Sequence, residues 1–260
     1  MRIITLISDW GLTDFYVAAV KGMIFKFHPK AVIVDITHQV QPFDYAEAAY
    51  ILKNAYSNFP DGTIHIVGIN TEESINYAHI VAYYNKHYFI GTDDGIFSLI
   101  FDNDPEYIVE LNIPLESSIH TFSSRDRFAK AAAHIAQGGK LEELGPIRKE
   151  LVKKILFNPP INEDSLIGMV IHIDNYHNLI TNITKTDFKK FVSGSKFEIS
   201  FRSQKYKASK IHESYGDVRP GEIVALFTSN GLLEIAINKS KAASLLGIHK
   251  KDPVLVTRIG

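Results

Sequence analysis

The 260-residue sequence contains no cysteine. This absence excludes disulfide bonds, thiolate catalysis and any zinc or iron–sulfur site that is built on cysteine. No apolar run approaches the roughly eighteen residues of a membrane-spanning helix, and no signal-peptide pattern precedes the first apolar segment. We therefore expect a cytoplasmic protein that does not insert into a membrane.

The sequence also lacks an excess of charge of either sign. Lys and Arg together number 28, against 29 for Asp and Glu. The net charge thus gives no reason to expect nucleic acid or an anionic membrane as a partner. Hydrophobic residues make up 45% of the chain, which is enough to build a sizeable core in one large or two modest domains.

The common signatures of nucleotide-binding and metal-dependent enzymes are missing. The chain has no G-x-x-x-x-G-K, no G-x-G-x-x-G after its first apolar run, no H-E-x-x-H and no G-x-S-x-G. A bound nucleotide would therefore not be recognised through its phosphates. The eleven histidines are scattered, and we interpret His65 and His172, which lie in apolar runs, as core or edge residues. We expect neither a metal nor a cofactor.

The first part of the chain does show a repeated strand-and-helix pattern. Residues 3–7 and 31–36 are short apolar runs typical of buried parallel strands, and helical spacing follows each of them. We predict that Thr13 caps the first helix with Asp14 in its first turn, and that the second helix begins near Pro42. The later elements expected are a strand at 63–69, a hairpin at 80–84 and 88–92, and a small-residue helix at 128–135.

A proline-rich segment divides the sequence. Pro159-Pro160 and their polar neighbours suit an extended linker, which we place at 157–165. Before it, residues 1–156 are predicted to form an α/β domain with a mainly parallel central sheet. After it, residues 166–260 are predicted to form a smaller all-β, barrel-like domain, because short strands alternate with glycine turns. The strands expected there are 166–173, 197–201, 223–227, 232–237 and 254–258.

Polar loops follow the strands predicted for the first domain. The carboxyl ends of parallel strands meet at one edge, where open α/β sheets bind ligands. Asp9 is therefore the first acid that we expect to hold a substrate hydroxyl, and its alternative role is to cap a turn. Phe43 either belongs to the core or faces a ligand. We interpret Asp93-Asp94-Gly95 as a turn, since the calcium-loop pattern is not completed.

Two polar stretches stand out in the second domain, at 174–182 and 228–234. Turns are their default interpretation, because Asn and Asp side chains bond to local backbone. The first stretch also combines an acid, an aromatic ring and an amide within five residues, which can clasp a heterocycle and an ammonium group. The second offers hydroxyl and amide donors that suit a carboxylate.

Taken together, six motifs have the order and spacing of one protein family. They are Ser8-Asp9-x-Gly11, Asp35-x-x-His38, Pro42-Phe43-Asp44, Thr121-Phe122-x-x-Arg125-Asp126, Asp174-x-Tyr176-x-Asn178-x-x-Thr181-Asn182 and Ser229-x-Gly231-x-Leu233-Glu234. From residue 1 to about 258 the chain resembles the S-adenosylmethionine hydroxide adenosyltransferases, which are related to fluorinase and chlorinase. The resemblance implies a homotrimer with sites between one subunit's first domain and a neighbour's second domain. It also implies cleavage of S-adenosylmethionine by attack of water or a halide on the 5′ carbon of the ribose.

The resemblance further implies substrate contacts from the first domain. By position, Asp9 would accept hydrogen bonds from the ribose hydroxyls. Phe43 and Phe122 would form apolar walls beside the ribose and the sulfonium. Trp10 is the other substrate-binding residue that we expect in this domain.

The second domain would hold the two ends of the substrate. By position, Asn178 would contact the adenine and Tyr176 would cover it. The residues that match positions holding the methionine ammonium and carboxylate groups are Asp174, Ser229 and Asn230. Glu234 completes the expected substrate-binding set.

The chain departs from the family pattern where the attacking water would be activated. The hydrolases that it resembles share an Asp-Pro-Gly loop after the third strand, an arginine seven residues later and a histidine after the Phe122 position. The matching residues here are Asn70, Tyr77 and Ser123, and Ser124 stands where fluorinase has a halide-contacting serine. We take Asn70, Ser123 and Ser124 as the candidate catalytic residues.

This departure leaves several functions open. Another base acts, with His120, Glu72 and His79 nearest in the sequence, or water attacks with little assistance, or hydrolysis is lost. Our first hypothesis is an enzyme that cleaves S-adenosylmethionine to adenosine and L-methionine. The alternatives are a non-catalytic protein that binds S-adenosylmethionine or adenosine, and a relative that uses a halide.

Overall fold

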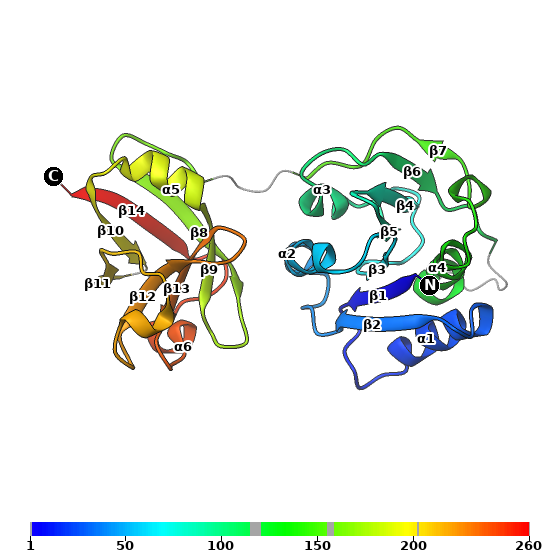
Figure 1. The fold of residues 1–260 in the computed structure, drawn as a ribbon, viewed down its shortest axis with the longest axis horizontal. Helices are drawn as coiled ribbons and strands as arrows, with labels where there is room; N and C mark the ends of the chain where they lie inside the picture. The colour runs from blue at the N-terminus through cyan, green and yellow to red at the C-terminus, as the bar shows by residue number, and fades with distance from the viewer. Residues whose placement is uncertain (1, 115–120, 155–158, 202, 260) are drawn as a thin grey trace. The chain divides into compact units, whose positions relative to one another are not determined.

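Figure 1 shows a computed structural model that describes residues 2–114, 121–154, 159–201 and 203–259, without the side chains of residues 203–205. The chain divides into two compact units, residues 1–156 and 157–260. Each unit has a hydrophobic core of its own. The predicted linker, 157–165, begins at two residues that lie outside the described part of the chain.

The first unit is a mixed sheet with a parallel core and helices. Its strand order is β2-β1-β3-β5-β4-β6-β7. The parallel strands are β1 (Ile3–Ser8), β2 (Val32–Thr37), β3 (Ile64–Gly68) and β5 (His87–Thr92). The antiparallel strands are β4 (His79–Tyr84), β6 (Tyr107–Glu110) and β7 (Ile147–Arg148). This arrangement confirms the predicted α/β domain.

The helices of this unit are α1 (Tyr16–Phe27), α2 (Tyr45–Ala55), α3 (Phe97–Ile100) and α4 (Ala129–Ala136). The apolar face predicted for α1 is present, since Val17, Val20 and Ile24 are buried. A π-helical turn, Ser124–Phe128, leads into α4. Turns of this kind occur frequently at functional sites.

Both predicted helix starts are too early, by two residues at the N-cap of α1 and by about three residues at the start of α2. Helix α1 begins at Tyr16, and its N-cap is Phe15, which makes no side-chain cap, rather than Thr13. The chain therefore stays in a loop through Asp14. Helix α2 begins after Asp44, whose side chain accepts a hydrogen bond from the backbone N–H of Glu47. Phe43 has a φ of 62°, in the left-handed region, so a helix cannot run through it from Pro42.

The second unit is an antiparallel, nearly closed barrel, which confirms the predicted all-β domain. Its strand order is β11-β10-β14-β8-β9-β13-β12. The strands are β8 (Ser165–Ile173), β9 (Leu179–Thr184), β10 (Lys196–Phe201), β11 (Ser203–Ala208), β12 (Ile223–Phe227), β13 (Leu232–Ile237) and β14 (Pro253–Ile259). An isolated bridge between Ile211 and Ala225 links the chain after β11 to β12. The sequence analysis did not name β9, β11, or the helices α5 (Lys185–Val192) and α6 (Ala242–Leu246).

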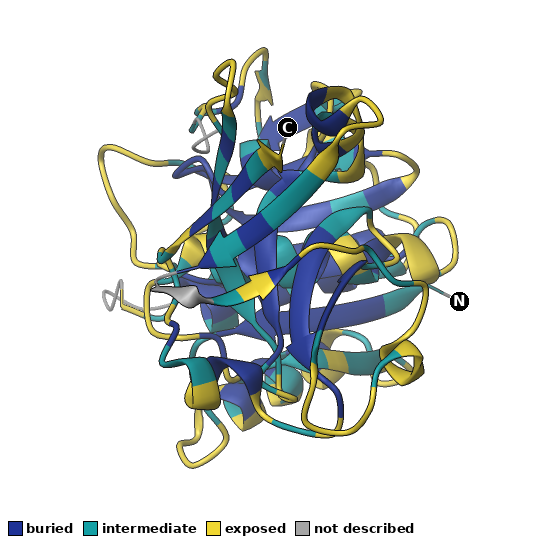
Figure 2. Ribbon diagram, turned by 90° about the vertical axis from the view of Figure 1, so that its left-hand side faces the viewer, coloured by how far each residue is buried: buried dark blue, intermediate teal, exposed yellow. Residues whose placement is uncertain are grey.

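Burial along the strands differs between the two units. In the first, β1 and β3 are buried at nearly every position, as expected for parallel strands covered on both faces. Figure 2 shows dark, buried residues concentrated in the strands and exposed residues on the loops. In the first half of β8, buried residues alternate with partly exposed ones, as expected where one face of a strand meets the core. Among the residues that the structure describes, no helix combines the length and the apolar character that crossing a membrane requires.

The parallel core sets the place of the polar loops in the first unit. Strands β1, β2, β3 and β5 point the same way, so their carboxyl ends lie at one edge of the sheet. The loops that carry Asp9, His38, Asn70 and Asp94 all begin there. This edge is where a ligand is expected in a sheet of this kind.

Candidate functional site

Asp9 connects two loops at the carboxyl edge of the first sheet. Its Oδ2 accepts a hydrogen bond of 2.9 Å from the backbone N–H of Phe43. Burial raises the pKa of the half-buried Asp9 carboxyl, and the hydrogen bond from Phe43 acts in the opposite direction. Asp9 thus joins two loops, and this contact differs from the turn cap that we gave as its alternative role.

Trp10, which follows Asp9 in the chain, belongs to a group of aromatic rings. The ring of Trp10 meets that of Phe122 edge to face at a centroid distance of 6.3 Å, and Tyr16 approaches Phe122 in the same way at 5.4 Å. Phe43 is 72% exposed, so the interpretation that it belongs to the core is wrong for this chain. The structure therefore brings Asp9, Trp10 and Phe122 to one apolar, partly open edge.

A buried polar network lies beneath the Asp9 loop. Ser8 Oγ and His38 Nδ1 share a hydrogen bond of 2.7 Å, and His38 Nε2 lies 3.1 Å from Asp35 Oδ1. The ring of Trp10 stacks on that of His38 with an interplanar angle of 14°. A Cβ at position 68 would collide with the Trp10 ring, so Gly68 permits this packing. The network holds Trp10 and the backbone next to Asp9 in one position.

The candidate catalytic residues lie around the loop that follows β3. Asn70 adopts a left-handed conformation with a φ of 50°, which asparagine tolerates better than most residues. Ser124 Oγ donates a hydrogen bond of 2.9 Å to Thr71 Oγ1. The Ser123 hydroxyl is buried and has no hydrogen-bond partner among the described residues. The structure thus links the Asn70 loop to the two serines, and Ser123 offers a hydroxyl that a ligand can satisfy.

Among the three alternative bases, His79 is the one whose contacts decide whether it can accept a proton from water. His79 Nδ1 lies 3.0 Å from Arg127 Nη1. Because a guanidinium only donates, Nδ1 must be the acceptor and the proton of the neutral ring must sit on Nε2. Burial and then Arg127 lower the pKa of His79 to about 4. Its accepting nitrogen is therefore already used, which excludes His79 as the base in this arrangement.

The other two alternatives receive no support from the structure. Glu72 is exposed, as is Tyr77 at 38%, in a loop that is exposed along most of its length. His120 lies outside the described residues. No group of three or more His, Cys, Asp or Glu residues in the described part of the chain could hold a metal ion.

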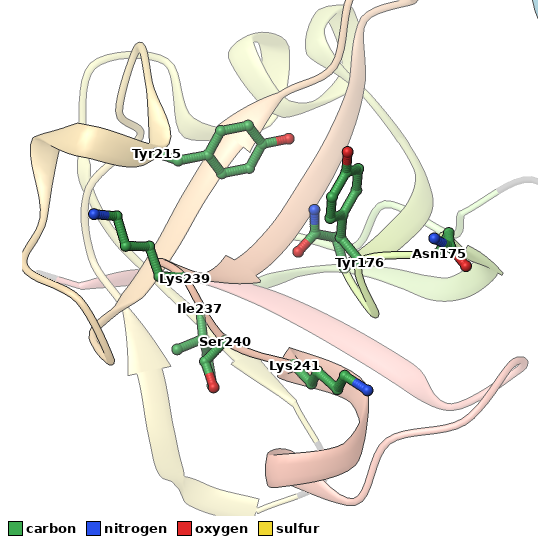
Figure 3. Close-up of a pocket in the computed structure, with 8 residues that line it drawn as sticks. Asn175, Tyr176, Tyr215, Ile237, Lys239, Ser240 and Lys241 are labelled. Atoms are coloured by element: carbon green, nitrogen blue, oxygen red, sulfur yellow. The ribbon is translucent and has the colours of Figure 1, made fainter.

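The second unit contains a pocket with a volume of about 550 Å³. It is lined by Asn175, Tyr176, Asn178, Tyr215, Ile237, Lys239, Ser240 and Lys241. In Figure 3, Tyr176 and Tyr215 project from separate segments toward the same space. The ammonium groups of Lys239 and Lys241 point to opposite sides, so they do not converge on one anion. Two aromatic rings around such a volume suit a flat heterocycle.

Two carboxylates next to the pocket fix the Asn178 amide. The backbone N–H of Asn178 donates to Asp174 Oδ1 at 2.8 Å, and Nδ2 donates to Asp174 Oδ2 at 3.2 Å. Asn178 also hydrogen-bonds to Glu234, which accepts a 2.7 Å bond from the Tyr215 hydroxyl. Carboxylates only accept, so the amide NH₂ of Asn178 must face them. Its Oδ1 is left as the acceptor of the side chain, and Asn178 is one of the residues that line the pocket.

Glu234 is the most buried acid of this cluster, at 4% exposure. Burial raises its pKa and the charge of Asp174 raises it further, whereas the hydrogen bonds from Tyr215 and Asn178 lower it. Burial, followed by the hydrogen bond to Glu234, also raises the pKa of Tyr215, so this hydroxyl remains a donor at neutral pH. The structure therefore brings Asp174, Asn178 and Glu234 together, with Tyr176 on the same pocket.

Ser229 and Asn230 lie elsewhere in the same unit. They belong to the turn between β12 and β13, where the carbonyl of Gly231 accepts a hydrogen bond from the N–H of Lys185, just after β9. The turn that holds Asp174 precedes β9. At about 3.4 Å per residue, five steps of strand separate the two turns by about 17 Å. Asp174 and Ser229 of one chain are thus too far apart to hold the ammonium and carboxylate of the same methionine.

Several pocket residues are not predicted by the sequence motifs. Tyr215, Lys239 and Lys241 line the pocket without belonging to a motif that we had singled out. One signal was available, because Ser214 and Asp217 form a capping box around Tyr215. A serine followed three residues later by an acid is a recognisable turn signature.

Comparison with known families matches both units. A model of the SAM hydroxide adenosyltransferase N-terminal domain matches residues 4–145, and a model of the C-terminal domain of the same family matches residues 168–255. The chain therefore belongs to the S-adenosylmethionine hydroxide adenosyltransferase family.

Individual relatives cover nearly the whole chain. An (R)-S-adenosyl-L-methionine hydrolase of Thermus thermophilus is 31% identical over 98% of this chain and 99% of the relative. A fluorinase of Nocardia brasiliensis is 28% identical, and the alignment covers 93% of this chain and 92% of the fluorinase. The crystal structure of an uncharacterized conserved protein from Thermotoga maritima matches with a TM-score of 0.90 and 29% identity, covering 98% of this chain and 100% of that one.

The Tyr215 hydroxyl provides a test of the electrostatics in the pocket. The substitution Tyr215→Phe removes a donor that favours the ionised form of Glu234 but keeps the ring. We expect the pKa of Glu234 to rise further. An NMR titration of glutamate labelled with ¹³C at the side-chain carboxyl measures this shift, with the exposed Glu222 as a reference signal. An unchanged or lower pKa for Glu234 would contradict the hydrogen-bond network.

Proposed function

We propose that this protein cleaves S-adenosylmethionine by attack of water on the ribose 5′ carbon, giving adenosine and L-methionine. One structural observation supports this function most: Asn178, whose amide nitrogen is held by carboxylates, lines a pocket together with two tyrosines. An oriented acceptor beside flat apolar surfaces complements a base that carries an amino group, as adenine does. Membership of the family makes S-adenosylmethionine the adenine compound to test first.

The two half-sites divide the substrate between them in this proposal. Asp9 accepts from the ribose hydroxyls, while Trp10, Phe43 and Phe122 provide apolar surface near the sulfonium. Aromatic faces attract cations, so such a surface also suits a positively charged sulfur. In the second unit, Tyr176 and Tyr215 take the base and Asn178 accepts from its amino group.

The distance between the two turns indicates where the amino-acid end of the substrate binds. Ser229 and Asn230 can receive the methionine carboxylate at one end of β9 while the base occupies the pocket at the other. Asp174 then has a different first task, because its carboxylate already accepts two hydrogen bonds from Asn178. We propose that Asp174 and Glu234 act on the base by orienting Asn178.

The chemical step requires little acid catalysis. The sulfonium leaves as a neutral thioether, so the protein chiefly aligns the attacking oxygen opposite the sulfur and excludes other water. Ser123, Ser124 and Asn70 can orient a water molecule, but none of them can deprotonate it. General-base assistance is typically worth about a hundred- to ten-thousand-fold, so we expect slow turnover compared with relatives that keep an acid and a histidine.

A non-catalytic binding protein is the second candidate. The engagement of His79 by Arg127 favours it, because one alternative base is thereby excluded. A halide-using enzyme is the third candidate, favoured by the unpartnered Ser123 hydroxyl, which can donate to an anion as well as to water.

Product analysis separates the three candidates. The protein is incubated with S-adenosylmethionine, with and without chloride or fluoride, and the mixture is separated by chromatography. We expect adenosine and methionine in equal amounts, with no dependence on halide. Halogenated adenosine would establish the third candidate, and intact S-adenosylmethionine that co-elutes with the protein would establish the second.

Asp9 provides a test of the ribose contact. The substitution Asp9→Ala should weaken adenosine binding by about 2–4 kcal/mol, because two ribose hydroxyls lose a charge-assisted acceptor. Calorimetry measures the dissociation constant. Asp14→Ala, an exposed acid in the same loop, is the matched control and should bind as the wild type does. An unchanged constant for Asp9→Ala in a folded protein would leave Asp9 with its loop-bonding role alone.

We further propose that the protein forms a homotrimer with each site shared between two chains. Large apolar side chains are exposed in loops of the first unit, including Leu12 at 65%, Phe15 at 64% and Ile75. Exposed apolar loops of this kind are typical of surfaces that associate.

Subunit exchange tests the shared site. Asp9→Ala and Asp174→Ala each disable a different half-site, so a mixture of the two variants after exchange should regain adenosine binding at sites that combine two intact halves. Separate incubation of each variant is the control. Proven exchange without recovery of binding would show that each site is built from one chain.

A further inference from the structure

We propose that Asp94 is a positioning residue that acts through Asn70. Its negative charge makes the nucleophile site favour water over a halide. This inference rests on the proposed function and names the attacker at the same site. The sequence pattern predicts only a turn at Asp94. Its partner Asn70 is one of the positions where the chain departs from the acid of the related hydrolases.

The geometry joins the two residues directly. Asn70 follows β3 and Asp94 follows β5, which are neighbouring parallel strands. Asn70 Nδ2 donates a hydrogen bond of 3.1 Å to Asp94 Oδ2. The other carboxylate oxygen, Oδ1, accepts from the N–H of Ile96 at 3.2 Å. At 4% exposure, the Asp94 carboxylate is thus held in place and almost removed from solvent.

The adjacent acid behaves differently. Asp93 lies 3.5 Å from Arg148 Nη2, and both its oxygens accept from the N–H of Val152. Asp93 and Arg148 thus form an ion pair, whereas Asp94 forms none with any residue that the structure describes. Hydrogen bonds alone therefore stabilise the Asp94 charge, and one of the two donors is the Asn70 amide. A charge in so buried a place acts strongly on its neighbours, because little water screens it.

The Asn70 amide connects the Asp94 carboxylate to the loop that follows β3. Since Nδ2 must face the carboxylate, Oδ1 faces away from it as an acceptor. The hydroxyl of Thr92 donates to the Asn70 carbonyl at 2.9 Å and fixes the backbone as well. Thr71, the next residue, accepts from Ser124. Asn70 is thus one residue from the threonine that joins this loop to Ser124.

An acceptor backed by a negative charge discriminates between nucleophiles. Water can donate a proton to Asn70 Oδ1 while serine hydroxyls complete its hydrogen bonds. A halide has no proton to donate and is repelled by the charge. The serines alone would accept either attacker, so Asp94 is the residue that decides between them.

The reaction on this account is a displacement at carbon. A bond forms between the water oxygen and the ribose C5′, the bond between C5′ and sulfur breaks, and its electron pair stays on the sulfur of methionine. The proton of the attacking water passes to bulk water. Asp94 does not take this proton, because the Asn70 amide lies between them.

The test removes the negative charge of Asp94 and keeps the shape of its side chain. Asp94→Asn removes the negative charge but leaves an oxygen that can accept from Asn70. Asp93→Asn, in the same turn, is the matched control for loss of a buried acid. The exchange variant Asn70→Asp with Asp94→Asn restores one carboxylate and one amide in reversed positions. Each protein is incubated with S-adenosylmethionine in sodium chloride or sodium gluconate at equal ionic strength, and adenosine, chlorinated adenosine and adenosine affinity are measured.

We expect Asp94→Asn to form adenosine at least tenfold more slowly, with adenosine affinity within twofold of the wild type. Chloride should then inhibit this variant or enter its product, and gluconate should not. The exchange variant should recover water selectivity, and Asp93→Asn should keep it. A residue that only supports the turn would lower rate and affinity together without a specific effect of chloride.

Two results overturn the inference and are distinguishable. If the wild type turns over S-adenosylmethionine and Asp94→Asn keeps both its rate and its indifference to chloride, the inference fails while the proposed function stands. If the wild type binds adenosine but forms neither product, the proposed function fails and the role of Asp94 fails with it.

Discussion

The parallel pairing of β1 with β2 and β3, extended by β5, determines where the polar loops of the candidate site lie in the first unit. Because these strands run the same way, side chains that are far apart in the sequence emerge at one edge. Asp9 reaches the backbone of Phe43, and Asn70 reaches Asp94, only because of this pairing. The remaining contacts of the edge, from the Ser8 and His38 pair to the Trp10 stack, hold these loops still.

Both units use the same device to orient a polar group. In the first, a carboxylate holds the amide of Asn70, and in the second, Asp174 and Glu234 hold the amide of Asn178. An isolated asparagine can present either its oxygen or its nitrogen to a ligand, whereas a fixed one presents only the oxygen. Buried networks of this kind specify one arrangement when all their members are satisfied. On the proposed function, one amide recognises the base and the other selects the nucleophile.

Sequence patterns predicted the α/β and barrel architectures because strand periodicity and glycine turns are local signals. The predicted start of α2 was wrong because Phe43 is left-handed and its N–H binds Asp9, 34 residues away, and no local pattern reveals such a contact. The pairing of Asn70 with Asp94 spans 24 residues and depends on β3 and β5 lying side by side although β4 comes between them in the sequence. The separation of Ser229 from Asp174 likewise depends on which strand β13 pairs with. Residue types pointed to these positions, but only the strand order shows which of them meet.

The central claim is that a water oxygen becomes bonded to the ribose 5′ carbon. Incubation of the protein with S-adenosylmethionine in water enriched in ¹⁸O, followed by mass spectrometry of the adenosine, tests this bond directly. The account predicts adenosine that carries the label in its 5′ hydroxyl and methionine that carries none. Unlabelled adenosine, or labelled water with no conversion of S-adenosylmethionine, would contradict it.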